Sequence, residues 1–355
     1  MQIVFDNIIF SLQKSGGISV VWYELLTRLH RLHHLKPLFI DNTKAKNHYH
    51  SQIQFNDRNI IGKIHYPSIS RYLSVNVALN EPFIFHSSYY RYCTNPKAIN
   101  ITTVHDFTYE FFRKGIQKKI HSWQKFKALR HSNYIVCVSK NTQHDLLNLF
   151  PEIDERKVRV IYNGVSDEYH RLPSSFDIIR SLPFSQHSYV LYIGDRSEYK
   201  NFPLCVKAVS QTNYNLVIVG KSLTNSEENL LKQHMPKERY RATGFITNEK
   251  LNILLNYAAA LIYPSIYEGF GIPILEAQKA GCPVIACNNS SIPEVLSSKT
   301  LMMDNVSIRE LVAKLKLLSN NDLIQEVRTA GIKHSKNFSW DKMATQYYNL
   351  YQELY

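Results

Sequence analysis

Apolar and polar positions alternate along the chain in two successive series, and each series begins with a run typical of a buried strand. Gln2 to Phe10 is almost continuously apolar and rich in branched residues, as expected of a strand inside a parallel sheet. Ile18 to Leu32 then carries apolar residues at three- and four-residue spacing, which predicts a helix. Gly16 and Gly17 occupy the turn between the two patterns. The chain therefore begins with a predicted strand–helix unit.

The same alternation continues through the rest of the chain. In the first half, strands are predicted at 35–40, 82–86, 99–104, 134–138 and 158–162, with helices at 111–130 and up to about residue 150. In the second half, strands are predicted at 189–193, 215–219, 240–243, 261–263 and 283–287, with helices at 202–211, 227–234, 249–258, 274–280, 307–318 and 343–355. Residues 42–59 are polar and are expected to be irregular. Ser139 or Asn141 is expected to cap the helix that follows them.

A polar connection from Ser166 to His187, with prolines at 173 and 183, separates the two series. Two strand–helix series of this kind predict two doubly wound α/β domains with parallel sheets, facing each other across a cleft. We expect an N-terminal domain over residues 1–170 and a C-terminal domain over residues 185–337.

The stretch from Tyr263 to Glu276, YPSIYEGFGIPILE, is the richest in candidate chemistry. A strand pattern ends there in a glycine-containing loop with Glu268, and Pro273 suits the first turn of a helix. That geometry places Glu276 in the first turn. Free N–H groups at a helix start favour a phosphate, and carboxylates accept hydrogen bonds from hydroxyls. The stretch thus suits a phosphorylated sugar, although similar turns are common in α/β proteins, where first-turn glutamates often only complement the helix dipole.

Two predicted strands of the first half end in polar side chains. One is followed by Tyr89, Tyr90 and Arg91, and the next by His105 and Asp106. Because ligands in open α/β sheets lie beyond the carboxyl ends of the strands, both tips are candidate parts of a site.

Composition narrows the class of protein. The hydrophobic content of 44% and charged content of 20% are typical of a soluble globular protein. Five scattered cysteines without metal-ligand spacing predict reduced thiols in a cytosolic setting. The first residues lack the basic region of a signal peptide, and no apolar run is long enough for a spanning helix, so we expect a cytoplasmic protein. The net charge of +13 favours an anionic partner, whether nucleic acid, lipid surface or phosphorylated substrate, unless the lysines only serve solubility.

Several motifs recur in a recognisable order. They are Gly16-Gly17, His105-Asp106, Asn163-Gly164-Val165, Gly194-Asp195-Arg196 with Lys200-Asn201, Gly244, Glu268-Gly269-Phe270-Gly271 with Glu276, and Pro293-Glu294. In this order they resemble the retaining, nucleotide-sugar-dependent glycosyltransferases of family 4. The resemblance covers nearly the whole chain and is most specific at 261–295. It implies the GT-B fold of two Rossmann-like domains, with a C-terminal helix at 338–355 that crosses back to the N-terminal domain.

The resemblance also assigns roles on the donor side. It implies that Arg196 and Lys200 hold the donor diphosphate, where their charge offsets the charge that builds on the leaving nucleotide. It implies that Glu276 accepts hydrogen bonds from the ribose hydroxyls and that Glu268 faces the transferred sugar. Other donor contacts are expected from Gly269, Phe270, Gly271 and Ile272. The aspartate between Gly194 and Arg196 departs from the family pattern.

On the other side of the predicted cleft, the resemblance places His105 beside the sugar ring as a hydrogen-bond donor. It implies that Asp106 orients the loop or assists the acceptor, which makes His105, Asp106 and Glu268 the catalytic candidates. Gly16 and Gly17 are expected to let the first loop approach the donor phosphate and the acceptor. Tyr89, Tyr90 and Arg91 are expected to line the acceptor groove. The family mechanism is a front-face transfer in which the leaving phosphate helps to take the acceptor proton.

Residues 111–130 carry seven lysines and arginines and no acidic residue, interleaved with aromatic and aliphatic side chains at roughly helical spacing. Such a helix fits an anionic membrane surface. Our hypothesis is that it docks the enzyme on the cytoplasmic face of the inner membrane, near a lipid-diphosphate-linked glycan. The alternative is an ordinary helix with an apolar stripe in the core and solvated lysines.

The resemblance implies a glycan or lipid-linked glycan acceptor, a nucleotide-sugar donor and no metal or other cofactor, since no DxD motif lies between the domains. Mannose from GDP-mannose is the first choice of donor because it is frequent in the family, with glucose, galactose, rhamnose, fucose and N-acetylhexosamine open. A phosphorylase or sugar-nucleotide epimerase of the same fold is the enzymatic alternative. A nucleic-acid-binding protein is the other alternative, disfavoured because no helix-turn-helix, zinc or RNP motif occurs.

Overall fold

The computed structural model describes residues 1–31, 35–173 and 182–355, and these residues form two compact units. Unit 1 consists of Met1–Gly164 and Trp340–Tyr355, and unit 2 of Val165–Ser339. The chain thus changes unit directly after Gly164. The N-terminal domain was predicted to extend to residue 170. Of the residues that the sequence analysis assigned to a helix or to the connecting segment, Leu32 and 174–181 lie outside the described ranges.

Unit 1 is built on a parallel sheet. Within the described residues, its seven strands follow the order β3-β2-β1-β4-β5-β6-β7. They are β1 (Gln2–Asp6), β2 (Lys36–Asp41), β3 (Ile60–Lys63), β4 (Phe83–Ser87), β5 (Ala98–Val104), β6 (Tyr134–Cys137) and β7 (Val158–Val160). The strand order reverses between β1 and β4, which pair in parallel from Ile3 beside Ile84 to Asp6 beside Ser87. A reversal of this kind leaves a crevice beyond the carboxyl ends of the two strands, where ligands bind in doubly wound proteins.

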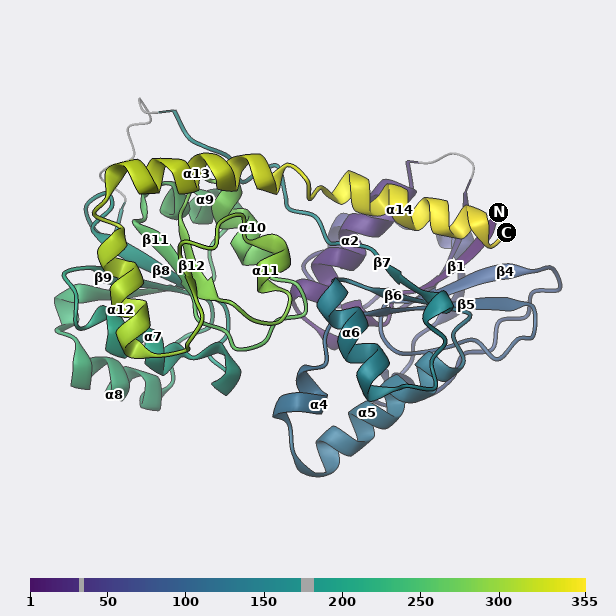
Figure 1. Cartoon of the computed structure of the whole chain (residues 1–355). Coiled ribbons are helices and arrows are strands. Elements are labelled where there is room, and N and C mark those ends of the chain that lie inside the picture. The colour runs from purple at the N-terminus through teal and green to yellow at the C-terminus, as the bar shows by residue number, and fades with distance from the viewer. Residues whose placement is uncertain (32–34, 174–181) are drawn as a thin grey trace. The chain divides into compact units, whose positions relative to one another are not determined.

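Helices cover both faces of this sheet (Figure 1). The α-helices are α1 (Ile9–Leu12), α2 (Gly17–Leu29), α3 (Pro67–Ser70), α4 (Thr108–Phe112), α5 (Gly115–Arg130), α6 (Lys140–Leu149) and α14 (Trp340–Glu353), and the short 3₁₀ turns are η1 (His50–Gln52), η2 (Asp57–Asn59) and η3 (Glu155–Lys157). Ser139 caps α6 as expected, because its Oγ accepts the N–H of Thr142 at 3.0 Å.

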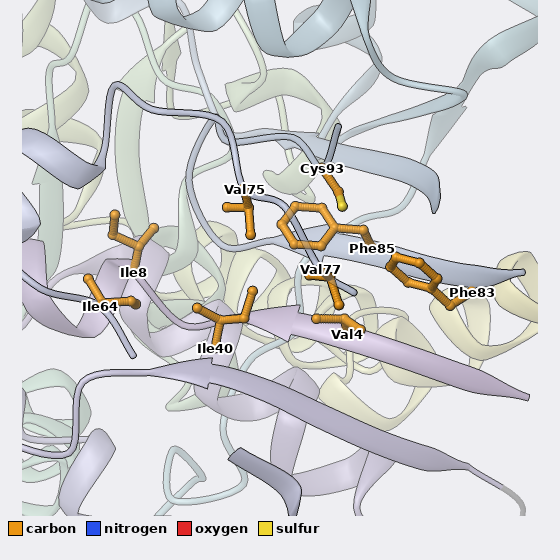
Figure 2. Packing of buried hydrophobic residues seen from close by; sticks show 9 residues of the cluster. All are labelled: Val4, Ile8, Ile40, Ile64, Val75, Val77, Phe83, Phe85 and Cys93. Atoms are coloured by element: carbon orange, nitrogen blue, oxygen red, sulfur yellow. The ribbon is translucent and has the colours of Figure 1, made fainter. Parts of the chain in front are cut away.

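The core of unit 1 on the β1–β4 side is a dry cluster of branched and aromatic side chains (Figure 2). Val4 and Phe85 come from the paired strands β1 and β4, and Ile40 comes from β2. Val75 and Val77 reach the same cluster from the loop between α3 and β4. Part of this face of the sheet is therefore covered by the loop between α3 and β4, and not by a helix.

Unit 2 repeats the architecture. Within the described residues, its six parallel strands follow the order β10-β9-β8-β11-β12-β13. They are β8 (Tyr189–Ile193), β9 (Asn215–Val219), β10 (Tyr240–Gly244), β11 (Ala260–Tyr263), β12 (Val284–Cys287) and β13 (Met302–Met303). Its helices are α7 (Phe202–Val209), α8 (Asn225–His234), α9 (Asn248–Tyr257), α10 (Ile272–Lys279), α11 (Ile292–Val295), α12 (Ile308–Leu317) and α13 (Asn321–Ser335), with 3₁₀ turns η5 (Glu198–Lys200) and η6 (Lys237–Arg239). Here the strand order reverses between β8 and β11.

Two element predictions were wrong. The strand predicted over Gln2–Phe10 ends at Asp6, and α1 begins at Ile9. A short apolar run has the same pattern in a buried strand and in a buried helix, and here Ile9 and Phe10 are buried on a helix. The single helix predicted over 111–130 is two helices, because the backbone is extended at Arg113 and Lys114 and turns left-handed at Gly115, with φ of 72°.

The C-terminal helix α14 belongs to unit 1, where it packs beside α2 (Figure 1). Two buried tyrosines connect it to the sheet. The hydroxyl of Tyr351 lies 2.6 Å from Nδ1 of His86 on β4, and the hydroxyl of Tyr347 lies 2.9 Å from Oγ1 of Thr103 on β5. These contacts, together with a buried apolar face, make the last helix an integral part of unit 1.

Candidate functional site

In unit 2, the loops that follow β8 and β11 bring two predicted donor ligands together at the point where the strand order reverses. Lys200 ends the turn η5 after β8, and Glu268 lies in the loop after β11. The Nζ atom of Lys200 is 2.5 Å from Oε1 of Glu268, and both side chains are largely buried. Burial alone would lower the pKa of Lys200, but the carboxylate of Glu268 outweighs it and holds this pKa well above its usual value. Lys200 is therefore a permanently charged cation held at the switch point.

The loop that carries Glu268 is fixed by two serines that follow β12. The N–H of Glu268 donates to Oγ of Ser290 at 2.9 Å. The hydroxyl of Ser291 lies 2.9 Å from the carbonyl oxygens of both Glu268 and Phe270. Phe270 is itself buried, so any ligand contact from it comes from its main chain. No pattern in the sequence indicated this supporting role of Ser290 and Ser291.

The same loop ends at the start of α10. Gly271 precedes the helix with φ of 109°, a left-handed conformation that favours glycine, and Pro273 occupies the first turn, both as predicted. No side chain caps the first turn of α10. Ile272 and the residues after it therefore start a helix whose amino end is suited to an anion.

Glu276 lies in the second turn of α10, because the helix begins at Ile272, two residues earlier than predicted. The prediction that Glu276 occupies the first turn was therefore wrong. Its carboxyl group hydrogen-bonds to Tyr169, and burial raises its pKa to about 7, aided by the nearby Glu168. A carboxyl group with this pKa changes its charge near neutral pH, which the sequence pattern does not reveal.

The contacts of Arg196 are with protein groups that the sequence did not predict. Its side chain is 4% exposed and its Nε lies 2.8 Å from Oε1 of Glu227, near the start of α8. Its Nη2 also donates to the carbonyl oxygens of Lys221 and Ser222, at 2.9 and 2.8 Å. In this arrangement, the guanidinium group holds the loop after β9, and a role at the donor diphosphate stays a prediction.

Glycines end the three strands β8, β9 and β10, where Gly194, Gly220 and Gly244 all have positive φ. A Cβ atom on Gly220 would lie 2.6 Å from the carbonyl oxygen of Gly194, so only glycine fits there. The backbones of Gly220 and Gly194 therefore pack directly against each other.

In unit 1, Gly16 and Gly17 stand at the start of α2, after β1. A Cβ atom on Gly17 would meet no other atom within 4 Å, so the space beside this turn is open. The predicted approach of a ligand to these glycines remains a prediction.

His105 and Asp106 follow β5 at the carboxyl edge of the same sheet. Burial lowers the pKa of His105 to about 4, with an opposing contribution from Asp106 and a further lowering by Lys125. The imidazole is therefore neutral at pH 7 and carries one ring N–H for donation. Asp106 accepts the N–H of Thr108 at 2.9 Å, and its own carbonyl oxygen accepts Nζ of Lys125 at 2.8 Å.

Tyr89, Tyr90 and Arg91 do not share one surface. Tyr90 is buried, and the hydroxyl of the partly exposed Tyr89 lies 2.9 Å from Nε2 of His121. Arg91 pairs with the buried carboxylate of Asp6 at 2.8 Å. Arg91 also lines a cavity of about 480 Å³ in unit 1, together with Ile40, Ile61, Gly62, Lys63 and residues 74–79. Tyr90 and Arg91 are thus both buried, and the assignment of Tyr89, Tyr90 and Arg91 to an acceptor groove stays a prediction.

In residues 1–31, 35–173 and 182–355, no group of three or more His, Cys, Asp or Glu side chains is arranged to hold a metal ion. In the same ranges, no helix is both long and apolar enough to traverse a bilayer.

Two family models together match most of the chain. Residues 15–169 match the model described as Glycosyltransferase Family 4, and residues 175–338 match the model described as Glycosyl transferases group 1. The chain belongs to this family of group 1, family 4 glycosyltransferases. It is accordingly a glycosyltransferase.

Individual relatives agree with this assignment. O-antigen chain mannosyltransferase B of Escherichia coli is 28% identical over 274 residues, which are 72% of this chain and 70% of that protein. The serotype-specific mannosyltransferase WbdA of Escherichia coli is 24% identical over 66% of this chain, a match that spans only 29% of its own length.

Two solved structures of similar fold cover essentially the whole chain. Sucrose-phosphate synthase of Thermosynechococcus elongatus superimposes with a TM-score of 0.76 at 15% identity, over 99% of this chain and 98% of that one. Anabaena Alr3699/HepE, solved with UDP and glucose, superimposes with a TM-score of 0.74 at 14% identity, over 99% of this chain and 100% of that one. The predicted fold class, GT-B with two Rossmann-like parallel-sheet domains, is confirmed.

Proposed function

We propose that the protein is a retaining hexosyltransferase that moves mannose from GDP-mannose to a lipid-linked glycan during O-antigen synthesis. The observation that carries the proposal is the contact between Lys200 and Glu268 at the β8–β11 switch point, in a chain of this family. The choice of mannose and of an O-antigen glycan is supported by the mannosyltransferases among its relatives.

The chemistry proposed for unit 2 is electrostatic. Lys200 and the amino end of α10, which no side chain caps, offset the charge that develops on the diphosphate as the glycosidic bond breaks. Glu276 accepts hydrogen bonds from the ribose, which its ionised form does best. Glu268 orients a sugar hydroxyl. The departing phosphate takes the proton of the acceptor hydroxyl, so the new bond forms on the face that the nucleotide leaves and the configuration is retained.

The helix α5 supports a membrane-bound acceptor. Its outer face exposes Ile116, at 68%, and Trp123, at 53%, together with Ile120 and the cation Lys119. Exposed apolar side chains beside lysines insert at the boundary between headgroups and acyl chains, and the lysines attract anionic lipid. We propose that this face docks the enzyme on the cytoplasmic leaflet, where a lipid-diphosphate-linked glycan is presented.

A nucleotide-release assay over a panel of nucleotide sugars tests the transferase proposal, with and without lipid-linked glycan. We expect GDP release from GDP-mannose that depends on the acceptor, and a product in which the α-anomeric configuration of the donor is kept. An inverted product contradicts the retaining mechanism. Release from a UDP-sugar alone, with none from GDP-mannose, contradicts the donor assignment.

A substitution of Glu276 tests the proposal that this residue binds the donor ribose. Glu276→Ala is expected to weaken donor binding at least about 10-fold, because a charge-assisted hydrogen bond contributes about 1.5–3 kcal/mol. Glu326→Ala is the matched control, since Glu326 is exposed on α13. If both variants bind donor like the wild type, Glu276 is not a ribose ligand.

A further inference from the structure

The helix α5 buries several polar side chains and exposes apolar ones. Its buried face carries His121, Gln124 and Lys125 besides Ala128 and Leu129, while Ile116 and Trp123 lie on the exposed face. Lys125 is 0% exposed, and lysine is almost never fully buried unless it is paired. Placing an ammonium group in a protein interior is costly, so specific partners must offset its desolvation.

Two oxygen atoms from one short stretch of chain receive the ammonium group of Lys125. Its Nζ donates to Oε2 of Glu110 on α4 at 2.7 Å and to the main-chain carbonyl oxygen of Asp106 at 2.8 Å. The ring centre of Phe107 lies 4.3 Å from the same nitrogen, and that of Tyr90 lies 5.3 Å away. Lys125 therefore fixes the turn that follows β5 by hydrogen bonds from α5, while the start of this turn is fixed by β5 itself.

We propose that Lys125 is a positioning residue for sugar transfer, holding the His105–Asp106 turn in the orientation that the reaction needs. The inference rests on the proposed function, which places His105 beside the transferred sugar. A methionine of similar size would fill the same space without the cost of a buried charge. Such a residue could not donate to the carbonyl oxygen of Asp106, and this hydrogen bond is what a lysine adds.

The charge of Lys125 also bears on His105. The other titratable groups around this imidazole are Asp106 on its own turn, and His86 and Tyr90 from β4 and the segment after it. Burial and Lys125 lower the pKa of His105, whereas Asp106 raises it. Removing the charge of Lys125 is therefore expected to raise the pKa of His105. As pH falls, the imidazole would then become protonated at a higher pH than in the wild type.

Steady-state kinetics of Lys125→Met on the full chain, with the donor and acceptor identified for the wild type, test the proposal. We expect kcat to fall about 10- to 100-fold, the loss typical of a small misplacement of a reacting group. The KM for the donor is expected to stay within about twofold, because its nucleotide is proposed to bind in unit 2. The acidic limb of the pH–kcat profile is expected to move to higher pH. The control is Lys97→Met, at an exposed lysine just before β5. This variant is expected to have the wild-type kcat, donor KM and pH–kcat profile.

A double variant separates positioning from stability. Lys125→Met leaves the buried carboxylate of Glu110 without its ammonium partner, with Ser122 still donating to Oε1, whereas Lys125→Met/Glu110→Gln removes both charges and is expected to restore the melting temperature. The proposal requires that kcat stay low in the double variant. Recovery of kcat together with the melting temperature would show that the pair acts on stability alone and would overturn the proposal. A wild-type protein that transfers no sugar from any donor would overturn the proposed function and this inference with it.

Discussion

Lys200 and Glu268 come from loops that are 68 residues apart in the chain, and their charged atoms meet at 2.5 Å. The two loops follow β8 and β11, the neighbouring strands between which the order of the sheet reverses. A cation proposed to bind a diphosphate is thus already neutralised by a carboxylate proposed to face the sugar. An incoming diphosphate must compete with Glu268 for Lys200.

This competition predicts that Glu268→Gln binds nucleoside diphosphate more tightly than the wild type does. With the carboxylate gone, the buried charge of Lys200 has no anionic partner, and we expect the affinity for GDP to rise about 10-fold, or about 1.4 kcal/mol. Sugar transfer is expected to fall at the same time, because Glu268 no longer orients the sugar. Isothermal titration calorimetry with GDP measures the first effect. Equal or weaker binding in this variant would show that Lys200 is not a phosphate ligand.

A second prediction concerns Glu276 and the pH dependence of stability. The pKa of its carboxyl group is raised from 4.5 to about 7 by burial, so between these two values the folded protein holds a proton that the unfolded chain has lost. By linkage, the free energy of unfolding falls as pH rises from about 4.5 to about 7, and it levels off above. The loss is at most about 3.4 kcal/mol, because the pKa shifts by about 2.5 units and each unit corresponds to about 1.36 kcal/mol.

Urea denaturation of the wild type and of Glu276→Gln at pH 5 and pH 8 checks this dependence. The glutamine stays neutral at both values, so the variant is expected to gain stability relative to the wild type at pH 8 but not at pH 5. A difference between the two proteins that is the same at both pH values would mean that Glu276 titrates normally.

The strand and helix patterns predicted the two-unit α/β fold because buried parallel strands and amphipathic helices leave direct marks on the sequence. They did not predict how charged side chains are paired. Arg196 has the position of a phosphate ligand in the motif, yet it pairs with Glu227, which lies 31 positions further along the chain. Lys125 was one of seven cations in a basic stretch, and no local pattern distinguishes a buried lysine from a solvated one. Such pairings depend on tertiary contacts, which a single sequence does not record.

The exposed face of α5 predicts binding to anionic lipid. Replacing Ile116 and Trp123 together by glutamine is expected to abolish co-sedimentation with vesicles that contain phosphatidylglycerol, while the melting temperature stays unchanged because both side chains are exposed. Phe245→Gln is the control, since Phe245 is an aromatic residue of unit 2 that is even more exposed than Trp123, at 78%. Wild-type binding that does not depend on the anionic lipid content would contradict the proposal.

Metal independence gives a further prediction, since the family resemblance implies no metal. Extensive dialysis against EDTA is expected to leave the transfer rate within about twofold of its starting value, measured in metal-free buffer. A rate that disappears on chelation and returns with Mn²⁺ would refute the prediction.

The last prediction concerns α14. The hydroxyl of Tyr351 lies 2.6 Å from Nδ1 of His86, whose pKa is lowered to about 3 by burial, so at pH 7 a neutral imidazole accepts or donates one hydrogen bond there. Tyr351→Phe leaves this nitrogen buried without a partner, which is expected to cost about 1–3 kcal/mol of stability.

Hydrogen exchange followed by mass spectrometry locates the effect, because β4 and β5 pair with each other and contact α14 through His86 and Thr103. Their amides are expected to exchange faster, and those of β8 and β11 to keep the wild-type rate. Tyr355→Phe removes the same atom at a residue that is 61% exposed and is expected to change neither. Equal exchange in the two variants would mean that the hydroxyl of Tyr351 does not help to hold α14 on the sheet.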